Sequence, residues 1–274
     1  MRPIVILAVL LLAAPAGAAE MKITQAAPPA VYKVEGRAID VLGITPGMTA
    51  EQVRPILEKQ YGAVQEQTDA LGLNYRGTAV ESQKYLVTLR ARKDDDQIVV
   101  RFGTPATGNA VVEVSRQLAY PNGPAAPAVD AVRESLVKQY GPPSAQSSPV
   151  TSGALTLQDW AYKDNKPVRC ANASCRISGS EGMGPQDLES FRRAVASGRQ
   201  LLITATILSS TSDPKRAATT WIVVSDMQTK ARTLEEGLKQ LQAAASAENK
   251  RTSAAEGASE GEESPAPARP PRRR

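Results

Sequence analysis

A ten-residue segment occurs twice in this chain, and the repetition limits the folds open to it. Residues 53–62 read Val-Arg-Pro-Ile-Leu-Glu-Lys-Gln-Tyr-Gly and residues 132–141 read Val-Arg-Glu-Ser-Leu-Val-Lys-Gln-Tyr-Gly, with seven of ten positions identical at an offset of 79. Both copies carry apolar residues at helical spacing and end at a glycine, which is typical of an amphipathic helix. Two unrelated helices would readily share the valine and leucine but not the Lys-Gln-Tyr-Gly ending. The sequence therefore predicts a duplicated unit that begins with a helix.

The residues around the first helix and after both helices predict the rest of the fold. Thr49 is placed to cap the first helix, and Gln52, three residues later, completes a capping box. Strand-like segments follow at 71–75, 85–92, 97–103 and 110–120, and again at 155–162, 200–209 and 217–225. Apolar residues alternate along 85–91, which predicts a sheet with one buried and one wet face. The predicted fold is α+β, with two related helix-on-antiparallel-sheet units at 32–123 and 124–246.

The two ends of the chain differ in composition from these units. Arg2, an apolar run over 4–14 and small residues at 16–18 are the three parts of a secretory signal peptide, predicted at 1–19. The alternative is a membrane anchor, but a spanning helix needs about 20 apolar residues and this run is shorter. No later segment is apolar enough to cross a membrane. We therefore expect an exported, periplasmic protein whose signal peptide is cleaved, with a flexible leader at 20–31.

The last 28 residues, 247–274, are rich in Ser, Ala, Glu, Pro and Arg and lack hydrophobic periodicity, so they are predicted to be a disordered tail. Four arginines gather at its end: Arg269, Arg272, Arg273 and Arg274. Such a cluster suits contact with an anionic surface, at about 1 kcal/mol per basic residue near a charged membrane. The alternative is a solubilising extension.

Two cysteines, Cys170 and Cys175, lie close together in the chain. An even number in an oxidising compartment predicts a local disulfide. A redox pair normally has two intervening residues rather than four, and a structural zinc site needs four ligands. The chain contains no histidine, which excludes Ser-His-Asp and Cys-His catalysis and His-ligated zinc. We therefore expect no metal, no cofactor and no enzymatic activity.

The expected role is that of a binding or scaffold protein that engages another cell-envelope protein. A formal charge of +5 with mixed signs lacks the concentrated basic face of a nucleic-acid-binding protein. Candidate partner-binding anchors are the aromatics Tyr75, Tyr120, Trp160 and Trp221, each of which also suits a hydrophobic core. The alternatives are a cell-wall or polysaccharide hydrolase with paired carboxylates, and a small-ligand carrier with an enclosed pocket.

The segment 43–49, Gly-Ile-Thr-Pro-Gly-Met-Thr, with a helix ending in Tyr61-Gly62, resembles the start of the SmpA/OmlA (BamE-like) unit. In that unit a Pro-Gly-Met-Thr turn opens a helix that packs on a small antiparallel sheet, and tandem copies are similar to the β-lactamase-inhibitor-protein architecture. The resemblance covers about 44–120, with a fainter echo from 127 onward. It implies protein–protein binding in the envelope, such as support of outer-membrane assembly or inhibition of an enzyme. BamE-like proteins are lipoproteins, whereas this chain lacks the anchoring cysteine, and the matching positions serve the fold, so no functional residue is carried over.

Overall fold

Both copies of the repeated segment form helices. The computed structural model describes residues 19–34, 37–147, 155–170, 174–176 and 182–260. Within it, α1 (Ala50–Tyr61) and α2 (Val129–Tyr140) are each 12 residues long. The Thr49 backbone N–H donates to the Gln52 side chain at 2.9 Å, so the predicted capping interaction is present. Gly62 lies at φ +84° after α1, a conformation in which a side chain would be strained.

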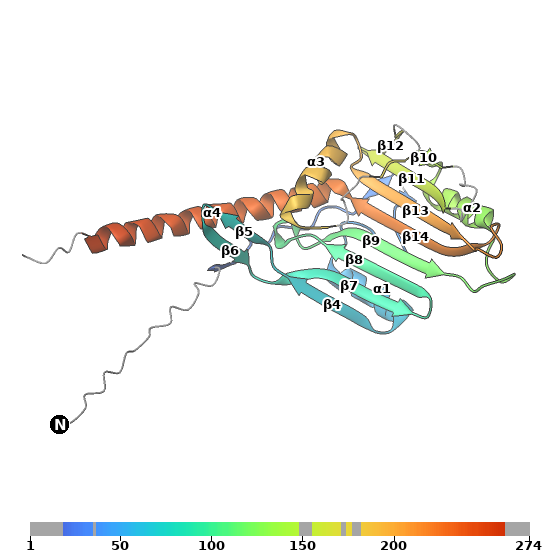
Figure 1. Ribbon diagram of the computed structural model, residues 1–274, viewed down its shortest axis with the longest axis horizontal. Coiled ribbons are helices and arrows are strands. Elements are labelled where there is room, and N and C mark those ends of the chain that lie inside the picture. Colours follow the sequence, from blue (N-terminus) through green and yellow to red (C-terminus); the bar gives the residue numbers. More distant parts are fainter. Residues whose placement is uncertain (1–18, 35–36, 148–154, 171–173, 177–181, 261–274) are drawn as a thin grey trace, which may run out of the picture.

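Antiparallel strands follow each helix and join into one large sheet (Figure 1). After α1 come β4 (Val64–Asp69), β7 (Tyr85–Lys93), β8 (Asp96–Phe102) and β9 (Val111–Ala119). After α2 come β10 (Ala145–Gln146), β11 (Leu155–Lys163), β12 (Lys166–Val168), β13 (Leu201–Ser209) and β14 (Ala217–Asp226). Over the described ranges the sheet has nine strands in the order β10-β11-β13-β14-β9-β8-β7-β4, with β12 paired to β11. The α+β class predicted from the sequence is confirmed.

Smaller elements lie beside this sheet. A mixed three-stranded sheet has the order β1-β6-β5, formed by β1 (Ala19–Met21), β5 (Gly72–Tyr75) and β6 (Thr78–Ser82). A short hairpin joins β2 (Lys33–Val34) to β3 (Arg37–Ala38). Two 3-10 turns, η1 (Pro105–Thr107) and η2 (Pro185–Asp187), precede β9 and α3 (Leu188–Ala196). The β5–β6 hairpin is an insertion between β4 and β7 that brings a second surface for helix packing.

One face of the large sheet carries α1 and α2 and the main hydrophobic core. Leu57 of α1 and Leu136 of α2 are buried in the same cluster as Leu89 and Ile203 from the strands. Side chains alternate along a strand, so the neighbours of these residues point to the opposite face. Arg90, for example, is exposed between buried Leu89 and Ala91, as the alternation in the sequence predicts.

On the opposite face of the sheet, the described helices lie at one end. There α3 and the start of α4 (Met227–Glu260) pack in a second cluster that contains Phe191, Leu202 and Leu234. Asp226 begins α4 by accepting the Thr229 backbone N–H at 2.8 Å, as an N-cap residue does. Among the residues that the structure describes, no helix covers the rest of this face (Figure 1).

The predicted flexible leader is wrong for the residues that the structure describes. Strand β1 pairs with β6, the Ala26 backbone N–H donates to the Pro105 carbonyl at 2.9 Å, and the Thr24 backbone N–H donates to the Gln240 side chain at 2.7 Å. The Pro- and Ala-rich composition is typical of linkers, but here η1 and α4 supply partners for the backbone groups. Residues 1–18 lie outside the described residues, so the signal peptide stays a prediction.

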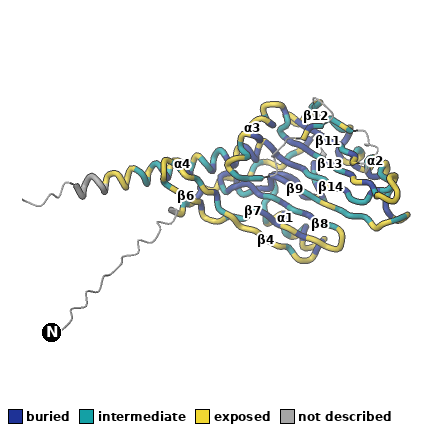
Figure 2. Tube along the Cα trace, viewed as in Figure 1, coloured by how far each residue is buried: buried dark blue, intermediate teal, exposed yellow. Residues whose placement is uncertain are grey.

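The predicted start of the disordered tail at Ala247 is also wrong. Helix α4 continues to Glu260 (Figure 1), and its residues 247–254 are mostly exposed (Figure 2). Residues 247–260 lack an apolar stripe, yet alanine, glutamate and lysine are strong helix formers. Extending an existing helix avoids the cost of nucleating a new one. Residues 261–274 lie outside the described residues.

Candidate functional site

The uncovered face of the sheet holds a hollow of about 300 Å³ across its central strands. Its floor follows one row of directly paired residues, Val99 on β8, Ser115 on β9, Val223 on β14 and Thr204 on β13. The pairing of β9 with β14 brings the two halves of the chain together at this point. The floor therefore combines residues more than 100 positions apart in the sequence.

Trp221 is the large aromatic side chain of this hollow. It lies on β14, directly opposite Gln117 of β9, and is 45% exposed. Its indole N–H donates to the Ser115 hydroxyl at 2.7 Å. This hydrogen bond satisfies the polar edge of the ring and fixes its orientation, while nearly half of the apolar ring surface stays in contact with water. A fixed and exposed tryptophan is typical of an interface anchor.

The structure places the other three aromatic candidates elsewhere. Trp160 is only 1% exposed, packs edge-on against Tyr140 at 5.4 Å between ring centroids, and donates its indole N–H to a backbone carbonyl. Trp160 is therefore a core residue, and the prediction of it as a partner-binding anchor is wrong, because its strand turns it toward α2. Tyr120 is half-buried and bonds Thr220 through its hydroxyl at 3.1 Å.

Tyr75 lies on the small sheet, away from the hollow, and packs against the cluster that contains α4. A hydrogen bond with the Gln242 side chain lowers the pKa of its phenol, and the Arg76 guanidinium lies 5.3 Å from its ring centroid. Tyr75 thus contributes to the docking of α4. The arginine cluster at 269–274 lies outside the described residues, and its contact with an anionic surface stays a prediction.

A buried carboxylate lies at one end of the hollow. Glu113 on β9 is 4% exposed, pairs with the Lys230 ammonium and the Arg101 guanidinium, and accepts the Ser225 hydroxyl at 2.8 Å. Burial by itself raises the pKa of Glu113, but the positive charges of Lys230 and Arg101 outweigh burial and lower it. The carboxylate is therefore ionised at neutral pH, and it joins the sheet to α4.

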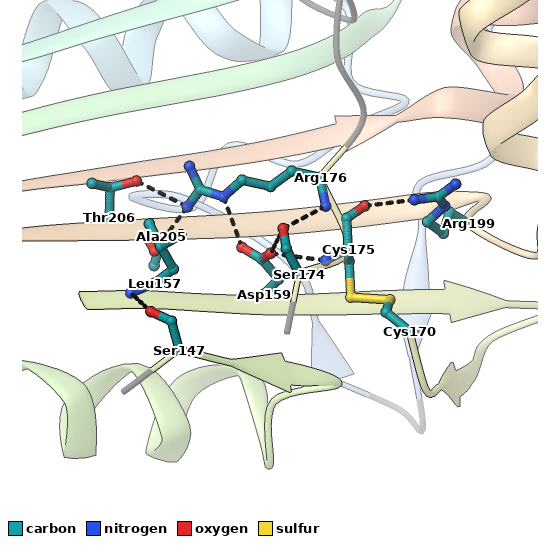
Figure 3. Close-up of polar contacts among 10 residues, drawn as sticks. All are labelled: Ser147, Leu157, Asp159, Cys170, Ser174, Cys175, Arg176, Arg199, Ala205 and Thr206. Atoms are coloured by element: carbon teal, nitrogen blue, oxygen red, sulfur yellow. Dashed lines mark hydrogen bonds and ion pairs between the residues drawn. A yellow bond between two sulfur atoms is a disulfide. The ribbon is translucent and has the colours of Figure 1, made fainter. Parts of the chain in front are cut away.

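The disulfide segment lies beside β11 and β13 (Figure 3), and its Arg176 lines the hollow. Cys170 and Cys175 are bonded, which confirms the predicted disulfide. Next to it, the completely buried Asp159 of β11 accepts the Cys175 backbone N–H and the Ser174 hydroxyl, both at 2.9 Å. These donors, supplied from the segment 174–176, compensate a charge that would otherwise be costly to bury.

Arg176 extends from this segment over β13 and lines the hollow (Figure 3). Its Nε pairs with Asp159 at 3.1 Å, and its Nη2 donates to the Thr206 hydroxyl at 2.9 Å and to the Ala205 carbonyl at 3.1 Å. The guanidinium is thereby held in one orientation although its side chain is 35% exposed. The disulfide closes the short loop just before Arg176, whose guanidinium lies on the uncovered face of the sheet.

Three arginines of the hollow were not identified from the sequence: Arg90, Arg101 and Arg176. Arg90 and Arg101 lie at polar positions of strands in which apolar and polar residues alternate. This pattern predicts that each side chain points away from the core, but it does not predict that the two are close together. Their proximity depends on strand order and on where the disulfide segment docks, which periodicity does not encode.

Within the part of the chain that the structure describes, no group of three or more Cys, Asp or Glu residues could hold a metal ion. No described helix is both long and apolar enough to span a membrane. Among the described residues that line the hollow, Glu113 is the one carboxylate, and it is already paired with Lys230. The hollow thus offers cationic, hydroxyl and aromatic groups for binding.

Comparison of the chain with protein-family models, with curated proteins and with solved structures finds no match. The resemblance to the BamE-like unit therefore stays a prediction drawn from the residues around the first helix.

Proposed function

We propose that this is a non-enzymatic binding protein of the bacterial periplasm, which engages another envelope protein through the uncovered face of its sheet. The observation that carries the proposal is Trp221, which is 45% exposed and held by Ser115 in the middle of that face. An exposed apolar ring costs solubility, and its fixed orientation lowers the entropy that a partner must overcome on binding. Such residues commonly dominate the free energy of an interface.

The charged groups of the same face support binding over hydrolysis. A glycoside hydrolase needs two carboxyl groups roughly 5 to 10 Å apart across its cleft. Here the described lining contributes Glu113 alone, and a carboxylate with a lowered pKa is a poor proton donor at neutral pH. A carrier for a small apolar ligand would need an enclosed apolar cavity, whereas this hollow includes three arginines.

We also infer that the chain consists of two related units, 32–123 and 124–246. Each begins with a 12-residue helix that carries the repeated segment. From the central β9–β14 pair outward, the strands run β9-β8-β7-β4 on one side and β14-β13-β11-β10 on the other, in matching order along the chain. Duplication of a helix-plus-sheet unit explains both the sequence repeat and this symmetry. The binding face then spans the junction between the units.

The proposal is tested by site-specific photocrosslinking in intact cells that make the protein. A photoreactive amino acid at Gln117, which lies opposite Trp221, should capture one dominant envelope protein. The same group at Lys59, which is exposed on α1 in the helix layer, is the control and should capture far less. Trp221→Ala should reduce capture from position 117 by a factor of about 30, because loss of an interface anchor costs about 2 kcal/mol or more. The proposal would be refuted if both positions captured equal amounts of partner, or if Trp221→Ala left the amount captured from position 117 unchanged.

A further inference from the structure

The hollow around Trp221 carries an excess of positive charge. Arg90 from β7, Arg101 from β8 and Arg176 beside the disulfide all line it, against the single lining carboxylate of Glu113. That carboxylate is paired with Lys230 of α4, which is completely buried. The charge presented to a ligand is therefore cationic.

Two of the three guanidinium groups are held in place before any ligand binds. Arg101 is anchored by Glu113, and Arg176 by Asp159 together with two acceptors on β13. A guanidinium has five N–H donors. The contacts of Arg176 use three of them, and no described residue accepts a hydrogen bond from its Nη1. Both arginines line the hollow, and their side chains are 31% and 35% exposed, so a ligand can reach them and little further ordering of these side chains is needed on binding.

Arg90 completes the group and differs from the other two. It is exposed and has no ion-pair partner among the residues that the structure describes. Beside it on the sheet lies Val99, and Val223 and the ring of Trp221 follow within the hollow. A ligand that fills the hollow must therefore offer both negative and apolar groups close together.

We propose that the hollow binds an acidic segment of the partner protein, whose carboxylates pair with Arg90, Arg101 and Arg176 while an adjacent apolar side chain packs on Val99 and Trp221. Planar guanidinium groups match carboxylates in a bidentate geometry. An extended segment with alternating acidic and apolar residues has the right chemistry. The inference rests on the protein-binding function proposed above and specifies the chemistry of the partner. Anionic lipids share the charge, but their acyl chains stay within the bilayer and the phosphates form its surface, so a polypeptide fits the hollow better.

The test is an NMR titration of the full chain with the peptide acetyl-Glu-Leu-Glu-Leu-Glu-amide at low ionic strength. The indole N–H signal of Trp221 should shift, whereas that of the buried Trp160 should stay unchanged and serve as the internal reference. The peptide acetyl-Lys-Leu-Lys-Leu-Lys-amide should not bind. Vesicles of phosphatidylglycerol, assayed by co-sedimentation, test the lipid alternative.

Arg90→Glu should raise the Kd for the acidic peptide about tenfold, because an attractive pair becomes a repulsive one. Lys59→Glu, which changes the net charge equally on the helix layer, should leave the Kd unchanged. Equal binding of the acidic peptide to wild type and Arg90→Glu would overturn the inference, as would binding of the vesicles but not the peptide. If the peptide does not bind but position 117 still captures an envelope protein, the inference that the partner segment is acidic is wrong, while the proposed protein-binding function still holds.

Discussion

Replacing Glu113 by alanine should destabilise the fold far more than replacing an exposed glutamate. Glu113 lies in the sheet at 4% exposure, and Lys230, its partner on α4, is completely buried. The substitution removes the carboxylate and leaves the Lys230 ammonium in the interior without that compensating charge. Arg101 also loses its anchor but is partly exposed, so water can solvate it.

The magnitude follows from the burial of the two charges. Removing one member of a buried ion pair costs about 3–5 kcal/mol, since the remaining charge stays desolvated. Domain stabilities are about 5–15 kcal/mol, so the loss is a large fraction of the total. Replacing both residues, Glu113→Leu with Lys230→Met, removes both buried charges and should recover most of the loss. Glu66→Ala is the matched control, because its pair with Arg54 is exposed and should be worth less than about 1 kcal/mol.

The assay is urea denaturation followed by far-UV circular dichroism, with the free energy of unfolding extrapolated to water for all four proteins. A loss of less than about 1 kcal/mol for Glu113→Ala would show that Lys230 does not depend on this carboxylate. A double variant as unstable as the single one would also refute the reasoning, because it would trace the loss to packing and not to charge.

Three further predictions concern acid, the disulfide and the leader. Folding lowers the pKa of Glu113, so its ionised carboxylate adds to the free energy of unfolding above pH 4.5, the ordinary pKa, and this addition is lost as the pH falls through the lower pKa of the folded state. Urea denaturation at a series of pH values should show this loss of stability in wild type and a smaller loss in Glu113→Gln. Cys170→Ser with Cys175→Ser should cost about 2 kcal/mol in the chain-entropy model, and the reducing agent that destabilises wild type should leave the variant unaffected. Gly108→Ala should cost more than about 1 kcal/mol in thermal unfolding, because Gly108 has φ +76° and an added Cβ would lie 2.4 Å from the Pro28 nitrogen; an unchanged melting temperature would contradict that packing.

Much of the secondary structure could be predicted because it depends on short-range patterns. The capping box at Thr49 and Gln52 and the alternation along β7 both involve residues a few positions apart. The predictions for the leader and for the segment after Ala247 were wrong because they relied on amino-acid composition, which does not show the contacts that a segment makes in the fold. The leader resembles a linker and the segment after Ala247 resembles a tail, yet one is held by η1 and α4 and the other extends an existing helix.

The sequence by itself determined the two repeated helices, six strands of the large sheet, the buried side of β7, the repeat and the disulfide pair, because hydrophobic periodicity, capping and cysteine spacing act locally. Only the tertiary structure decided which strands are neighbours. The β9–β14 pairing puts Trp221 beside Ser115, and the docking of the disulfide segment puts Arg176 on the same face as Arg90. Strand order is set by the free energy of burying whole surfaces of the folded chain, and no short segment carries that information. For this reason Trp221 could be named as a candidate from the sequence, while the cationic hollow around it could not.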